Sequence, residues 1–221
     1  MKKEGCVLKW SPTIVSLALA AATLIIYGII YDERSVQIYL QVSAAAFVPA
    51  AFPLIGKITK KDFPICVGVL ATTHIFLAND LGSALGFYGL IPSWDLIMHG
   101  FFGLVFAVIA KEFMLRWGCG AMKKGGFYLL IFLSTAGAAA RWEIWEFICD
   151  IVLDGDAQRV KEAMANGANP VADTMTDIMI TLAGVAVFYI VIFIAKLRGY
   201  DLGAKKSGKT GSKSENDRRK G

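Results

Sequence analysis

Six apolar runs dominate the chain, and each is about as long as the roughly 20 residues that a helix needs to cross a bilayer. They extend over 11–31, 38–55, 64–78, 94–115, 127–150 and 173–194. Lipid offers no hydrogen-bond partners, so a spanning segment must satisfy its own backbone groups. The runs also lack the alternating polarity of a β-barrel strand. The sequence therefore predicts an all-α polytopic membrane protein, a bundle of about six transmembrane helices.

Composition divides the chain into a bundle over residues 1–200 and a tail over 201–221. Only 19% of the residues are charged, against about 25% in soluble domains. The tail is rich in Lys, Arg, Gly and Ser, a composition typical of disorder. It can lie on anionic headgroups or serve only as a topological anchor, and neither role requires nucleic acid. Pro49 and Pro53 predict a kink in the second helix.

The distribution of Lys and Arg sets the orientation. Nineteen of the 23 lie in four segments that alternate topology places on one side: 2–9, 57–61, 111–124 and 196–220. By the positive-inside rule that side is the cytoplasm. We therefore expect a multi-pass protein of the plasma (inner) membrane with both termini cytoplasmic.

Acidic residues show the opposite bias. Twelve of the 18 fall in the outer loops or the outer ends of helices, although acids contribute little to topology. An outer surface lined by carboxylates attracts cations. The imbalance therefore predicts a polar site near the outer face.

Helical spacing brings seven of these polar residues onto shared faces. Those on one helix are three, four or seven positions apart, so they line one side of it. The chain direction places all of them at the outer ends of the fourth, fifth and sixth helices. These candidate metal ligands are Asp95, His99, Glu143, Glu146, Asp150, Asp173 and Asp177. We expect His99, Glu143, Glu146 and Asp177 to lie deepest, with the other three above them.

One imidazole and several carboxylates suit a divalent cation whose identity the pattern leaves open. Ionisable side chains within a membrane usually face the bundle interior and indicate a site or pathway. Glu143 and Glu146 are the candidate catalytic residues, because either could act as a general base beside a metal ion. The alternative for each residue is an interfacial side chain in contact with water and headgroups.

Three segments resemble the YjdF-like family of bacterial inner-membrane proteins. The first is 79–103, with Phe87-Tyr88, Trp94-Asp95 and His99. The second is Glu143-x-x-Glu146 with Asp150, and the third is Asp173-Thr174-x-x-x-Asp177. The resemblance covers the third to sixth helices. It implies a small multi-helix inner-membrane protein whose family has no established activity.

Three classes of function remain open at this point. The first is a metal-dependent membrane enzyme that acts on a lipid-linked or small-molecule substrate outside the cytoplasm. The second is a small transporter coupled to cations or protons. The third is a membrane scaffold in which the polar cluster only fixes the helices. The lipid bilayer is the one expected partner in all three, and the oligomeric state is left open.

Overall fold

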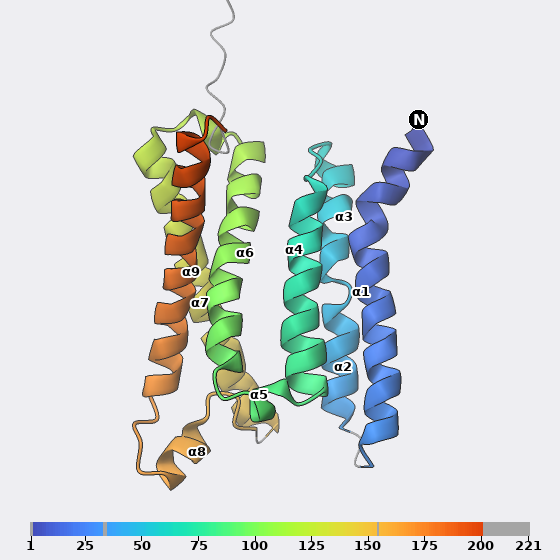
Figure 1. Ribbon diagram of the computed structural model, residues 1–221, viewed down its shortest axis with the longest axis vertical. Coiled ribbons are helices and arrows are strands. Elements are labelled where there is room, and N and C mark those ends of the chain that lie inside the picture. Colours follow the sequence, from blue (N-terminus) through green and yellow to red (C-terminus); the bar gives the residue numbers. More distant parts are fainter. Residues whose placement is uncertain (1, 33–34, 154, 201–221) are drawn as a thin grey trace, which may run out of the picture.

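The computed structural model describes residues 2–32, 35–153 and 155–200, and all regular elements within these ranges are helices (Figure 1). Five helical segments are long and apolar enough to cross a membrane. These are Val7–Ile30, Val36–Thr59, Ile65–Ala84, Trp94–Arg116 and Ala172–Leu197. The predicted all-α polytopic fold is confirmed. The basic tail, 201–221, lies outside the described residues.

The remaining predicted helix is α7 (Lys124–Leu153), which has 30 residues. It is long enough to span a bilayer, but it is not among the five apolar segments. Its C-terminal half carries Arg141, Glu143, Glu146 and Asp150, which lower its hydropathy. It nevertheless packs along α6 (Trp94–Arg116) and α9 (Ala172–Leu197), so it completes the bundle.

The helices form two groups (Figure 1). The first contains α1 (Lys2–Ile30), α2 (Val36–Ala45), α3 (Ala51–Thr59) and α4 (Ile65–Ile75), and the second contains α6, α7 and α9. Packing of α4 against α6 joins the groups, and the short α5 (Phe87–Leu90) lies in the connection between them. Each group has its own buried cluster, around Val42 in the first and around Phe127 and Ile131 in the second. The chain is thus two small bundles placed side by side.

The second membrane segment breaks where its prolines predict. Helix α2 ends at Ala45, a 3₁₀ turn η1 (Val48–Ala50) contains Pro49, and α3 continues to Thr59. Proline lacks the backbone N–H that would continue the helical ladder, and its ring clashes with the preceding turn. The predicted kink is therefore a short 3₁₀ turn between two helices of one span.

The third membrane segment extends further than the predicted end at Ala78. After α4 the chain continues as a π-helix, η2 (Phe76–Ala84). Polar and small residues such as Asn79, Asp80 and Gly82 are typical of a helix end, but η2 packs against α1, α2 and α4. That packing overrides the local preference. Asp80 is consequently inside the bundle, with only 2% of its surface exposed.

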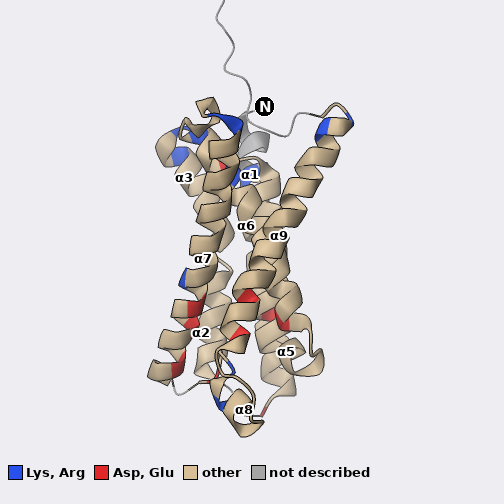
Figure 2. Cartoon of the chain, turned by 90° about the vertical axis from the view of Figure 1, so that its left-hand side faces the viewer, with Lys and Arg blue, Asp and Glu red and all other residues tan. Residues whose placement is uncertain are grey.

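Charge is segregated along the long axis of the molecule. Figure 2 shows Lys and Arg gathered at one end and most Asp and Glu at the other. The N-terminus and the end of α9 lie at the same, basic end (Figure 1). Large apolar side chains on these helices, such as Ile29, Leu40 and Ile58, are more than 60% exposed. A surface of this kind is suited to lipid.

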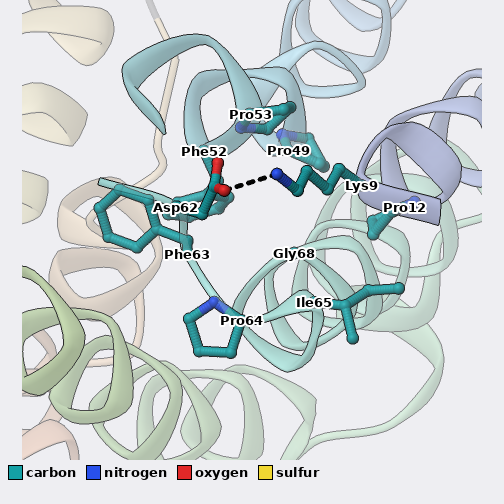
Figure 3. A pocket seen from close by; sticks show the side chains of 10 residues that line it. All are labelled: Lys9, Pro12, Pro49, Phe52, Pro53, Asp62, Phe63, Pro64, Ile65 and Gly68. Carbon is teal, nitrogen blue, oxygen red and sulfur yellow. Dashed lines mark hydrogen bonds and ion pairs between the residues drawn. The ribbon is translucent and has the colours of Figure 1, made fainter. Parts of the chain in front are cut away.

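The basic end contains a small cavity of about 20 Å³, the space of a single water molecule. Pro12, Pro49, Pro53 and Pro64 line it, and Lys9 Nζ lies 2.6 Å from Asp62 Oδ2 at its edge (Figure 3). Both charged side chains are about half exposed or more, and exposed ion pairs contribute at most about 1 kcal/mol. This cavity is a packing feature where four prolines meet.

Candidate functional site

Three polar side chains from α6 and α9 converge near the acidic end. His99 Nε2 lies 3.5 Å from Asp95 Oδ1 and 3.8 Å from Asp177 Oδ2. One ligand atom from each residue lies within 4.8 Å of the other two. His99 and Asp177 are buried, and Asp95 is partly exposed. We call these residues the acid–histidine triad.

Close contact between backbones holds the triad together. A Cβ atom on Gly103 would collide with the carbonyl oxygen of Thr181, and one on Gly184 would collide with that of Gly100. The two helices therefore touch main chain to main chain about one turn from His99 and Asp177. Small residues allow such close approach in membranes. The Gly100-x-x-Gly103 spacing in the sequence is the signal that could have predicted this contact.

Helix direction favours acids at this end of the bundle. Asp95 lies in the first turn of α6, and Asp173 lies in the first turn of α9. The N-terminus of a helix carries a partial positive charge, which stabilises nearby carboxylates by about 0.3–1 kcal/mol at exposed positions. Two helix N-termini therefore face the same acidic layer.

Arg159 provides positive charge beside this layer. Its Nη1 lies 3.8 Å from Asp173 Oδ1, and its Nε and Nη2 donate to Glu162 at 2.8 and 3.0 Å. The hydrogen bond to Glu162 raises the pKa of Arg159 above its usual range, and that bond lowers the pKa of Glu162. Arg159 also has a left-handed backbone, with φ of 51°. Strained backbone of this kind is often found at functional sites.

Glu143 lies on the neighbouring face, where Gln158 bridges two helices. Gln158 Nε2 donates to the Glu143 carbonyl oxygen at 3.0 Å and to Thr174 Oγ1 at 3.3 Å. The side chains of Gln158 and Thr174 lie near the Glu143 carboxylate, but neither of its buried oxygens has a described partner with hydrogen-bond geometry. A buried carboxylate with free oxygens is costly unless something binds it. Glu143 is therefore available to a ligand.

A cleft of about 340 Å³ adjoins Glu143. Its other lining residues come from α7, α9 and the segment that carries the short α8 (Val160–Ala165). Most of them are apolar, including Ile144, Phe147 and Val171. The cleft thus offers an apolar surface beside a buried carboxylate.

Glu146 and Asp150 have different local roles. Trp142 Nε1 donates to Glu146 Oε1 at 2.8 Å, which fixes that carboxylate on the C-terminal half of α7. Asp150 accepts from the backbone N–H groups of Ala157 and Gln158 at 2.6 and 3.0 Å. Asp150 thereby ties the following connection to the end of α7. Metal binding by either residue stays a prediction.

Tyr88 joins the site from α5, although spacing in the sequence does not predict its place there. Tyr88 is 39% exposed overall, but partial desolvation of its hydroxyl group raises the pKa of Tyr88 above its usual range, and the nearby charges of Asp95, Glu146 and Asp177 raise it further. Its ring packs against Gly82 of η2, where a Cβ would overlap it. Tyr88, Gln158 and Arg159 are the site residues that sequence reasoning missed. The signal that could have indicated Arg159 is its position in a connection that also contains Asp154, Asp156 and Glu162.

Comparisons with known proteins place the chain in a family. The family described as "Predicted membrane protein (DUF2238)" matches residues 12–198. An uncharacterised protein of Thermotoga maritima is 27% identical over 129 residues, which cover 58% of this chain and 62% of the relative. The match thus spans about three fifths of the relative's length. No solved structure matches. The chain belongs to the DUF2238 family of predicted membrane proteins, in agreement with the resemblance that its sequence shows.

Proposed function

We propose that the protein is a metal-dependent membrane enzyme that acts on a lipid-linked or small-molecule substrate at the outer end of the bundle. The observation that carries this proposal is the convergence of Asp95, His99 and Asp177, which offer three ligand atoms within 4.8 Å of one another. Oxygen and imidazole nitrogen suit divalent cations such as Zn²⁺ or Mn²⁺. No cysteine contributes, so a structural zinc site is not the expected type.

The distances within the triad fit a metal ion. Ligand atoms about 2.1 Å from a tetrahedral ion lie about 3.4 Å apart, and the two His99 contacts are 3.5 and 3.8 Å. A shift of a few tenths of an ångström would complete the coordination. Two carboxylates would also balance the charge of a divalent ion, which matters where the dielectric constant is low. Asp177 Oδ1 is buried and has no described partner, which leaves it available.

Glu143 and Glu146 are the proposed general bases. Both interact electrostatically with Asp95 across the site. A divalent ion in the triad would supply Lewis-acid activation of the substrate or of water. Glu143 or Glu146 would accept the proton released by the attacking water. The remaining predicted ligands, Asp150 and Asp173, would keep the entrance acidic.

The apolar cleft beside Glu143 supports a substrate that carries a lipid chain. Ile144, Phe147 and Val171 would contact the chain, while Glu143 and Thr174 would lie beside its polar end. Ligand sites are usually apolar concavities with a few polar groups. We therefore place the substrate between this cleft and the triad.

A transporter is the second candidate function. The observation that favours it is the layer of acidic residues beside buried carboxylates, because such an arrangement could also conduct cations. We test both by elemental analysis of the purified protein together with cation flux in proteoliposomes. About one divalent ion per chain without flux is the result we expect, with loss of the ion in His99→Ala and reduced binding in Glu146→Gln. Metal with flux would favour the transporter. If neither bound metal nor cation flux were found, and both variants were only less stable, the result would support the scaffold function.

We also propose that the basic end is cytoplasmic, so that the triad faces the extracytoplasmic side of the plasma membrane. Lys and Arg gather at the end where the N-terminus and α9 terminate (Figures 1 and 2), and such clusters are retained in the cytoplasm. Green fluorescent protein fused after Gly221 should fluoresce, and alkaline phosphatase fused there should be inactive. The opposite pattern would invert the site and exclude an extracytoplasmic substrate.

A further inference from the structure

A second buried carboxylate lies in the first helix group, apart from the triad. Asp80 belongs to the π-helix η2 and is 2% exposed. Its carbonyl oxygen accepts from the N–H of Leu85, five residues later, at 3.0 Å. π-Helical turns are rare and often occur at functional sites. In membrane transporters, irregular helical segments provide oxygen atoms for cations.

The Asp80 carboxylate is only partly satisfied. The hydroxyl group of Thr23, which is 3% exposed, lies close to this carboxylate from α1. The Oδ1 atom is buried and accepts no hydrogen bond from a described residue. Buried Ala20, Tyr27 and Ala84 belong to one apolar cluster in this part of the bundle. An ionised carboxylate in such a place is strongly unfavourable without a counter-charge.

No described ion pair supplies that counter-charge. Five helices pack against η2, and each has titratable side chains at or just beyond the end that lies near Asp80. These side chains are Tyr27, Tyr31 and Asp32 (α1 side), Tyr39 (α2), His74 (α4), Tyr88 (α5), and Asp95 and His99 (α6). Among the residues that the structure describes, this set contains no Lys or Arg. His74 packs against the rings of Phe101 and Phe102, and its Nδ1 has no described partner. A cation from solution could therefore supply the positive charge.

Further polar groups lie next to Asp80 along η2. Gln41 Nε2 donates to Asn79 Oδ1 at 2.9 Å and to Ser83 Oγ at 3.2 Å. Gln41 thereby connects α2 to both ends of the turn that contains Asp80. The segment is thus fixed in its wide π form by a neighbouring helix.

We propose that Asp80 and Thr23 form a binding site for a monovalent cation, a proton or a sodium ion, within the first helix group. One positive charge neutralises one carboxylate, whereas a divalent ion would leave a net charge in an apolar environment. Carboxylate and hydroxyl oxygens are also the ligand type that hard cations prefer. The site is independent of the triad and of the enzyme proposal.

The test is labelling of the full-length protein in detergent with dicyclohexylcarbodiimide. This apolar reagent adds to a protonated carboxyl group and leaves a stable acylurea, which mass spectrometry locates on the peptide that contains Asp80. We expect labelling at pH 6 in choline chloride. For a sodium site, labelling falls severalfold when NaCl replaces choline chloride at constant pH. For a proton site, NaCl has no effect, and labelling falls severalfold between pH 6 and pH 9.

Two results would overturn the proposal. Equal labelling at every pH and in both salts would mean a permanently protonated structural side chain. No labelling under any condition would mean that no exchangeable proton resides there. Asp80→Asn is the control for peptide assignment, and Thr23→Ser and Thr23→Val form a matched pair. We expect Thr23→Ser to behave as wild type, and Thr23→Val to shift the salt or pH at which labelling falls.

Discussion

Asp177→Asn is expected to lower the affinity for a divalent metal by at least about tenfold, since even residues that only orient ligands contribute 10–100-fold. The substitution keeps the shape of the side chain, but it removes one of the two charges that balance the ion. Asp177 is also the most buried member of the triad, with 2% exposure. Water cannot easily replace its oxygen there.

A graded series sharpens this prediction. His99→Ala should lower the metal affinity as much as Asp177→Asn does. Asp95→Asn should lower the metal affinity less, because the Asp95 side chain is 26% exposed and water can replace its oxygen as a ligand. Asp62→Asn is the matched control, since it makes the same chemical change at the basic end, on a side chain that is 61% exposed. Metal content is measured after dialysis against graded free metal. A metal ion retained equally in Asp177→Asn and Asp62→Asn would place the binding site elsewhere.

Gly103→Ala is expected to destabilise the protein by about 1–3 kcal/mol or more, the usual cost of overpacking. Its Cβ would meet the backbone carbonyl of Thr181, which cannot change rotamer to make room. Helices α6 and α9 would have to separate, and the ligands on them would separate too. Metal affinity should therefore fall together with stability.

Gly137→Ala on α7 is the matched control. Apart from its chain neighbours and the backbone of its own helix, no atom lies within 4 Å of the position that the new Cβ would take. Alanine is also the better helix former by up to about 1 kcal/mol. We expect its thermal unfolding in detergent to be unchanged or slightly raised, with full metal binding. If Gly103→Ala were as stable as Gly137→Ala, the backbone contact between α6 and α9 would be wrong.

The helical framework could be predicted from sequence because hydrophobic length decides which segments enter a membrane. The i, i+4 spacing of Asp95 and His99 likewise predicted a shared face, and the structure brings both close to Asp177. The end of the third helix could not be predicted. Asn79 and Gly82 resemble a helix end locally, and only packing against α1 and α2 keeps the chain helical to Ala84.

The residues that surround the triad were also beyond sequence reasoning. Gln158 and Arg159 lie in a connection without periodicity, so nothing in the sequence fixes where their side chains point. Asp150 determines this by accepting two backbone N–H groups of that connection. Spacing arguments therefore located residues on long helices and failed for residues that depend on a folded loop.

The glycine contact between α6 and α9 is the point about which the two helices would rotate relative to each other. Any tilt of α9 against α6 would turn about Gly103 and Gly184, where the main chains touch. Measured from the middle of the contact, between Thr181 and Gly184, the distance to Asp177 is about 8 Å and the distance to the end of α9 is about 22 Å, at about 1.5 Å per residue. A tilt that moves the far end of α9 by about 3 Å would shift Asp177 by only about 1 Å. The triad thus lies near the point of least motion, and rocking of the bundle would leave its ligands in place.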